Sequence, residues 1–341
     1  MSNTAEPPLD EQIDSNRPVM FCPRRLTHAN IFVGHLERSM AFYGDVCGLE
    51  GVGIEPGIRA GFLSNGNSHH DIGLVEVTTK ALIGRDGHVQ VPMGRGREPG
   101  LNHFGWEMEN EADLVDAYRR ACDAGLKIHR TVDHQIAHSV YVFDPDGNLH
   151  EFFADFTKDW RHIMKGGMLE LLTGNWTPGT PEPIRVPKYH VDPEIRHVSG
   201  SVFHPRRLVH AVIIARNYER MRRFFTDVGG LTVLHEANDR SYVCFGGKAG
   251  SWDVTMFRPQ MGESQALHHV SFEVESEDEL TAAEHELRRR TIGVERSLDL
   301  PSKRSVFIRD PDGFGVEFFR ARALDYASFA SVPASELRYH L

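Results

Sequence analysis

The sequence predicts an α+β protein made of four βαβββ modules that pair into two similar domains. The first observation is an internal repeat: a segment that begins at Arg24 recurs at Arg206, and the same offset aligns His28 with His210. The second is that both copies have the same order of apolar strand-like and helix-like stretches. The third is the length of 341 residues, which suits about two domains of ordinary size.

The elements of each module can be followed along the chain. A short apolar strand, HANIFV or HAVIIA, leads into a helix, and strand-like stretches such as GIRAGFLS and HHDIGLVEV follow. A second strand, HFGWEM or HVSFEV, leads into an acidic helix. Two further strands close around a DPDG turn, where Asp-Pro and the final Gly favour a tight hairpin. Each half is therefore predicted to be βαβββ followed by βαβββ.

The first copy contains an insertion. His103 aligns with His269, and the first DPDG turn with the second, at a smaller offset than the one between Arg24 and Arg206. This difference places extra residues in the first copy, between positions 77 and 100. The segment 78–100 is rich in glycine and basic residues. It is either a solvated loop or a lid whose Arg95 or Arg97 meets an anionic substrate.

The repeat divides the chain into five parts. The connector between the two domains is marked by its proline and glycine content. We expect an N-terminal tail over 1–23, a first domain with the active site over 24–155, a connector over 156–205, a second domain over 206–325 and a C-terminal tail over 326–341.

Composition excludes several classes of protein. A formal net charge of -10 gives no support for nucleic-acid binding. No apolar run approaches the roughly 18 residues that a membrane-spanning helix needs, and the acidic N-terminus does not resemble a signal peptide. The four cysteines show no paired spacing, which indicates free thiols in a reducing compartment. We therefore expect a cytoplasmic protein without membrane or nucleic-acid partners.

Two histidines and one glutamate recur at matched positions on predicted strands of the two copies. These residues are His28, His103 and Glu151 in the first copy, and His210, His269 and Glu317 in the second. A set of two histidines and one carboxylate can hold Fe(II) or Mn(II) and leaves three positions for a chelating substrate and O2. A single histidine on a strand is more often only structural, but the same triplet at the same places in a repeat favours metal sites.

The chain resembles the vicinal oxygen chelate superfamily, and within it the two-domain type I extradiol dioxygenases, which include catechol 2,3-dioxygenase. The motifs xHxxxxV, the HH pair, NHFGWE and SVYVFDPDGNxxEFF carry the resemblance, which runs from about Arg24 to Arg322. It implies cups of paired modules, each around one metal ion. It places the metal ligands of the first cup on His28, His103 and Glu151. The second triplet would then be a second metal site or a vestigial one.

The resemblance also implies which half is active. It places an acid–base histidine on His70, a tyrosine on Tyr141 and a further histidine on His134. The second copy has other residues at the equivalent positions, namely Trp252, Phe307 and Leu300. The first half thus keeps the three metal ligands and also the proton-handling groups. The usual member of the family, in contrast, has its working site in the C-terminal half. We expect His69, next to His70, to point to the opposite strand face and to be structural.

The resemblance implies an extradiol dioxygenase that inserts O2 into a catechol-type diol and cleaves the ring next to the diol, with Fe(II) or Mn(II) as cofactor. Two alternatives exist in the same superfamily: a metal-dependent glyoxalase-like isomerase or lyase, and a non-catalytic binding or resistance protein. The first usually needs carboxylate bases in place of His70, His134 and Tyr141, and the intact proton machinery argues against the second. We also expect a homo-oligomer.

Overall fold

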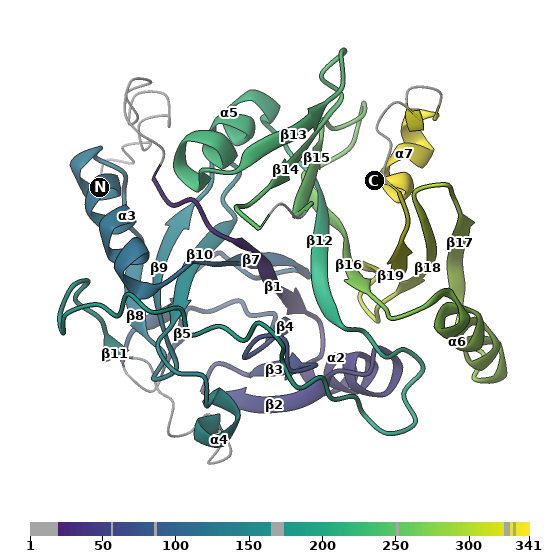
Figure 1. The fold of residues 1–341 in the computed structure, drawn as a ribbon, viewed down its shortest axis with the longest axis horizontal. Coiled ribbons are helices and arrows are strands. Elements are labelled where there is room, and N and C mark those ends of the chain that lie inside the picture. Colours follow the sequence, from purple (N-terminus) through teal and green to yellow (C-terminus); the bar gives the residue numbers. More distant parts are fainter. Residues whose placement is uncertain are drawn as a thin grey trace.

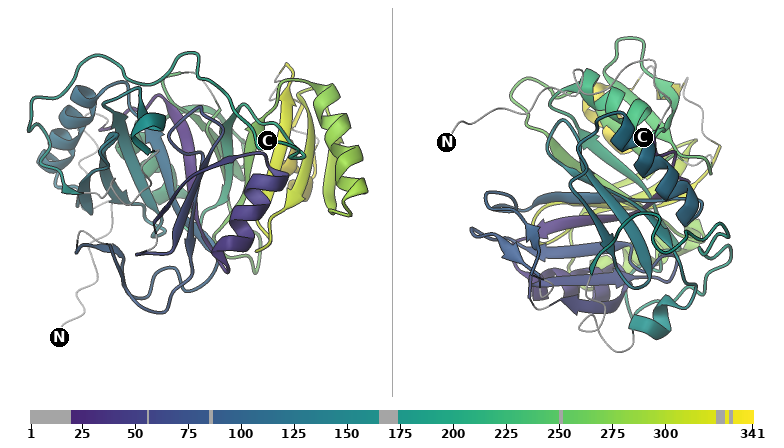
Figure 2. Two further views of the ribbon diagram at one scale, coloured as in Figure 1. Left: turned by 90° about the horizontal axis from the view of Figure 1, so that it is seen from below. Right: turned by 90° about the vertical axis from the view of Figure 1, so that its left-hand side faces the viewer.

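The structure, a computed structural model, describes residues 20–55, 57–84, 87–164, 174–249, 252–323, 328–329 and 332–341. Each half of the chain forms one strongly curled sheet (Figure 1). The strand order is β11-β8-β9-β10-β7-β1-β4-β3-β2 in the first sheet and β13-β14-β15-β12-β16-β19-β18-β17 in the second. Figure 2 shows the blue N-terminal half and the green and yellow C-terminal half side by side.

The first sheet contains two βαβββ modules, as predicted. The first module consists of β1 (Arg25–Val33), α2 (Leu36–Ala41), the π-helix Phe42–Val46, β2 (Glu50–Glu55), β3 (Ala60–Ser64) and β4 (Ile72–Glu76). The second consists of β7 (Gly100–Glu107), α3 (Glu111–Asp123), β8 (Arg130–Asp133), β9 (Ala137–Phe143) and β10 (Leu149–Asp155). Antiparallel pairing of β1 with β7 joins the two modules. The outer segments are β5 (Leu82–Ile83), β6 (Val89–Val91), α4 (Trp160–Met164) and β11 (Gly174–Asn175).

The second sheet repeats this arrangement. Its first module consists of β12 (Arg207–Ile214), α5 (Tyr218–Arg223), the π-helix Phe224–Gly229, β13 (Thr232–Glu236), β14 (Tyr242–Gly246) and β15 (Val254–Phe257). Its second consists of β16 (Ala266–Glu273), α6 (Glu277–Arg289), β17 (Val294–Asp299), β18 (Lys303–Arg309) and β19 (Gly315–Ala321). The four-module architecture predicted from the repeat is therefore confirmed.

The contacts that join the two sheets occur at equivalent positions of the repeat. The backbone amide of Leu26 on β1 donates to Oδ1 of Asp253 (2.8 Å), and that of Leu208 on β12 donates to Oδ1 of Asp71 (3.5 Å). Leu26 and Leu208 are counterparts in the repeat, as are Asp71 and Asp253. Each half thus lends the other a buried carboxylate, which satisfies an amide at the junction of the sheets.

Both ends of the chain contain ordered, buried residues where tails were expected. Phe21 is buried and stacks on Phe152, with ring centres 3.9 Å apart, whereas residues 1–19 lie outside the described part. The segment 326–341 includes helix α7 (Ala334–His340), and Leu341 after it is buried. Both packings depend on contacts with distant parts of the chain, which local sequence does not reveal. Among the described residues, no helix is long and apolar enough to cross a membrane.

Candidate active site

The register of the first sheet places the predicted site residues in one row. Glu151 on β10 lies opposite Tyr141 on β9 and next to Gly105 on β7, and Gly105 in turn lies opposite His28 on β1. Gly105 has no side chain, and this leaves room for His28: a Cβ at this position would lie 2.0 Å from the imidazole. His103 also lies on β7, two positions before Gly105.

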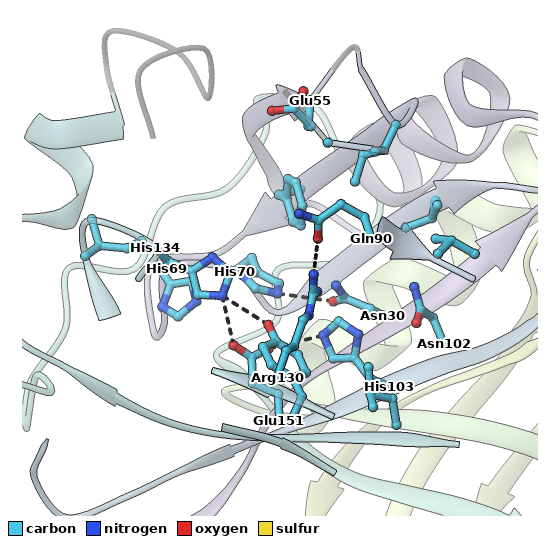
Figure 3. Close-up of a pocket in the computed structure, with 18 of the residues that line it drawn as sticks. Asn30, Glu55, His69, His70, Gln90, Asn102, His103, Arg130, His134 and Glu151 are labelled. Atoms are coloured by element: carbon cyan, nitrogen blue, oxygen red, sulfur yellow. Dashed lines mark hydrogen bonds and ion pairs between the residues drawn. The ribbon is translucent and has the colours of Figure 1, made fainter. Parts of the chain in front are cut away.

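This row brings His28, His103 and Glu151 together. Their ligand atoms lie within 4.8 Å of one another. Nε2 of His28 lies 3.1 Å, and Nε2 of His103 3.2 Å, from Oε2 of Glu151. The other carboxylate oxygen accepts a hydrogen bond from Ser139 Oγ (2.6 Å), which fixes the orientation of the glutamate. Figure 3 shows His103 and Glu151 at the floor of the pocket.

The three side chains have protonation states that suit a divalent cation. Burial lowers the pKa of His28 to about 4 and also lowers the pKa of His103, so both imidazoles are neutral near pH 7. Burial alone would raise the pKa of Glu151, but its close contacts with His103, His134 and His28 outweigh burial and hold this pKa well below its ordinary value. The set therefore offers two nitrogen lone pairs and one carboxylate.

His28, His103 and Glu151 fit a divalent metal ion such as Fe(II) or Mn(II). Nε2 of His103 is buried and makes no hydrogen bond of good geometry among the described residues, so its lone pair is available. Two neutral imidazoles and one carboxylate form the donor set of non-haem Fe(II) sites and also suit Mn(II). The set could therefore hold either metal.

The other predicted site residues line the same pocket. The ring of His70 is centred 4.0 Å from that of His28, and its Nε2 lies 3.1 Å from Oδ1 of Asn30. Nε2 of His134 lies 3.0 Å from the hydroxyl of Tyr141 and 3.4 Å from Oε1 of Glu151. The structure thus brings His70, His134 and Tyr141 into the pocket that His103 and Glu151 line, and the buried His28 contacts Glu151.

Alternation along a strand predicted that His69 points away from the site, but the structure places it at the site. It lines the same pocket, and Nδ1 lies 3.4 Å from Oδ1 of Asp155. The reason is local: residues 69–70 precede β4, in irregular backbone where alternation does not apply. His28, His69 and His70 form a second set of atoms close enough to hold an ion, although this set has no carboxylate.

The insertion forms a β5–β6 hairpin that contributes to the pocket. Gln90 on β6 lines the pocket and accepts a hydrogen bond from Arg130 on β8 (Figure 3). Arg95 does not line it: its guanidinium donates to Oδ1 of Asn102 (3.0 Å) and packs over the rings of two phenylalanines. Sequence reasoning did not single out Arg130, because an arginine on a strand is usually a solvated surface residue.

Comparison with known families shows which superfamily the chain belongs to. The model of the glyoxalase/bleomycin resistance protein/dioxygenase superfamily matches residues 25–152 and 207–318. The chain belongs to this superfamily. The two matched regions correspond to the two sheets, so each sheet is one copy of the superfamily fold.

Relatives and solved structures of the superfamily include ring-cleaving dioxygenases. The chain is 30% identical to biphenyl-2,3-diol 1,2-dioxygenase 3 of Rhodococcus globerulus over 131 residues, which are 38% of this chain and 63% of that protein. The match thus spans less than two thirds of that relative. The fold resembles a 2,3-dioxygenase of Pseudomonas sp. KL28 (TM-score 0.61, 19% identity, 91% of this chain and 96% of that one). It also resembles a Mn(II)-bound glyoxalase of Novosphingobium aromaticivorans (TM-score 0.60, 19% identity, 89% and 85%).

The second superfamily copy does not assemble its triplet in the same way. In the described part of the chain, the ligand atoms of His210, His269 and Glu317 do not gather within 4.8 Å. Nζ of Lys303 lies 2.7 Å from one oxygen of Glu317, and Ser271 Oγ donates to the other (2.6 Å). Nε2 of His269 lies 3.7 Å from that second oxygen.

The residues that differ between the superfamily copies explain this difference. Lys303 and Ser271 are the counterparts of Ala137 and Gly105 in the repeat, so both groups that engage Glu317 are absent from the first copy. Trp252, the counterpart of His70, packs with its ring centre 4.4 Å from that of His210.

Proposed function

We propose that the first cup is an extradiol dioxygenase site that cleaves a catechol-type ring next to its diol, with Fe(II) as the metal and Mn(II) as the alternative. One observation carries the proposal: His103 and Glu151 line a single pocket together with His70, His134 and Tyr141, and the buried His28 completes the His28, His103 and Glu151 set beside it. The dioxygenases among the relatives support it. The partners would be a catechol-type diol and O2.

The metal would be held by His28, His103 and Glu151, and when bound it would supply a Lewis acid and a template on which diol and O2 meet. Ser139 supports this set by fixing the Glu151 carboxylate through its hydrogen bond (2.6 Å). Such outer contacts orient ligands and typically change metal affinity by about 10- to 100-fold when lost.

His70 is the residue that would move the proton. Burial, followed by the proximity of His28 and His69, lowers the pKa of His70 well below its ordinary value, so the ring is neutral. When Nε2–H donates to Asn30 Oδ1 (3.1 Å), Nδ1 keeps the lone pair and can accept a proton from the diol. A Cβ on Gly73 would lie 2.1 Å from Asn30 Oδ1, so this glycine gives the amide its room.

Tyr141 and His134 would hold the substrate. Burial, followed by the charge of Glu151, raises the pKa of Tyr141 well above its ordinary value, so the hydroxyl stays protonated and remains a donor. His134 Nε2 lies 3.0 Å from this hydroxyl and can fix its direction. A protonated phenol beside the ligand row is suited to bond a diol oxygen or the charge that develops on the ring.

Two alternatives on this scaffold give different chemistry. A glyoxalase-like isomerase would use a carboxylate base beside the metal, and the proton-handling positions of this pocket are instead occupied by His70, His134 and Tyr141. A binding protein would need no proton-handling group at all. The resemblance to the glyoxalase structure is one of fold and does not favour either alternative.

Oxygen uptake with catechol by iron-loaded protein tests the proposal, with mass spectrometry to detect a ring-opened product. His70→Phe should keep wild-type metal content and lose turnover by about 10²- to 10⁴-fold, the usual size of an acid–base contribution. His285→Phe, on the exposed face of α6, is the matched control. A His70→Phe variant that loses its metal, or that turns over normally, contradicts the role given to His70.

A further inference from the structure

Arg130 is the only lysine or arginine among the described residues that line the pocket. It lies opposite Tyr141 in the β8–β9 pair, and its Cζ is 4.7 Å from the centre of the tyrosine ring. Its guanidinium donates to the neutral Gln90, while its Nε is buried without a partner among the described residues. In the same part of the chain, Arg130 forms no ion pair with a carboxylate.

The second repeat shows what this position can bind. Arg296 is the counterpart of Arg130 in the repeat, and it lies opposite Phe307 as Arg130 lies opposite Tyr141. The guanidinium of Arg296 holds both oxygens of the Glu336 carboxylate, which comes from α7. The same position in the fold therefore holds a carboxylate in the second repeat.

Helix α7 fills the space that is open in the first cup. Figure 1 shows it between the β13–β15 and β17–β19 arms of the second sheet. Leu337 and Leu341 pack there in one apolar cluster with second-repeat residues. Three members of this cluster, Val212, Cys244 and Phe257, are the counterparts of Asn30, Phe62 and Val75, which line the first pocket. The Glu336 carboxylate thus occupies, in the second cup, the place that corresponds to the pocket of the first cup.

We propose that Arg130 binds a carboxylate of the substrate, so that the first cup takes a catechol-type diol with an anionic side arm. This inference rests on the proposed function and names its substrate class. A guanidinium presents a planar fork of donors that matches a carboxylate, and burying it without a counter-charge is costly. Arg130 supplies such a fork, and Gln90 on the inserted hairpin holds it in place.

The position of Arg130 limits the length of the side arm. Arg130, Tyr141 and Glu151 occupy neighbouring strands in one row of the sheet. Two strand spacings place Arg130 roughly 10 Å from Glu151 along the sheet. A diol at the metal row would therefore reach the guanidinium with a ring and a short carboxylate arm, such as that of 3,4-dihydroxyphenylacetate.

The test compares 3,4-dihydroxyphenylacetate with the neutral 4-methylcatechol. We expect wild type to prefer the anionic probe in kcat/KM, and Arg130→Met to lower that preference by about 10- to 100-fold, the worth of a charge-assisted hydrogen bond. Arg119→Met removes an exposed arginine of α3, away from the pocket lining, and should leave the preference unchanged. An equal loss for both probes in Arg130→Met would overturn the proposal, because it would mean that Arg130 only supports Tyr141.

Calorimetric binding of both probes to Zn(II)-loaded protein separates this inference from the dioxygenase proposal. If no catechol is turned over but the anionic probe binds more tightly to wild type than to Arg130→Met, the dioxygenase proposal fails and the anion site stands. If turnover occurs but neither binding nor kcat/KM responds to the carboxylate, the anion site fails alone.

Discussion

Nζ of Lys303 lies 2.7 Å from Oε1 of Glu317, at a position where the first repeat has Ala137. Both residues are almost fully buried, so the ammonium supplies the positive charge that the glutamate would otherwise take from a metal ion. The two repeats thus satisfy equivalent glutamates in different ways. This ion pair supports the vestigial alternative for the second triplet, so that the proposed metal site lies in the first cup.

Ala137→Lys should transfer this arrangement to the first cup. Ala137 is buried on β9, on the same strand as Ser139, which contacts Glu151. A lysine here should pair with Glu151 as Lys303 pairs with Glu317, and metal content measured by mass spectrometry should fall from about one ion per chain to near zero. Ala137→Met, of similar length but without charge, should keep most of the metal. A fully metallated Ala137→Lys protein would contradict the account.

Gly105→Ser should weaken metal binding by displacing His28, because a Cβ at this position would lie 2.0 Å from the imidazole. The second repeat has Ser271 there, and its hydroxyl engages Glu317. We expect a loss of about 10- to 100-fold or more in affinity, as for other changes that disorient ligands, measured by competition with a chelator. Gly100→Ser on the same strand is the control, since its nearest neighbour is 4.0 Å away. Unchanged affinity in Gly105→Ser would show that His28 is not a ligand.

Asp71 should give the free energy of unfolding a measurable pH dependence. Burial raises its pKa from 3.8 to about 6, so the folded state holds the proton more tightly than the unfolded chain. The resulting stability is present below about pH 4 and is lost as the pH rises to about 6, by up to about 3 kcal/mol. Asp71→Asn cannot titrate, so its stability relative to wild type should rise over this interval in urea unfolding. The exposed Asp278→Asn should show no such trend, and a constant difference for Asp71→Asn would rule out this role.

Much of the fold could be predicted from the sequence because the chain contains an internal repeat. Its two constant offsets, one on each side of the insertion, assign each strand a counterpart, and the structure confirms the four modules that follow. The strand register then places these counterparts at equivalent positions in the two sheets. Glu151 lies on a strand between the strand that precedes the DPDG turn and the strand of His103. Glu317 lies between the equivalent strands of the second sheet.

Features outside the repeat could not be predicted in this way. Helix α7 has no counterpart in the described first half, and its place in the second cup depends on contacts with distant strands. Lys303 is a single substitution whose partner is visible only when the side chains are placed. The direction of His69 follows from irregular backbone before β4, which the alternation of a strand does not describe.

The most direct test of the central claim, that the first cup is the active metal centre, compares His103→Ala with His269→Ala. Both residues are buried and stand at the same position of the repeat, so each substitution removes the same chemistry from one cup only. Oxygen uptake with a catechol, measured with metal content on folded protein, should be abolished in His103→Ala and largely kept in His269→Ala. Loss of oxygen uptake in folded His269→Ala, with His103→Ala still active, would place the working site in the second cup and contradict this account.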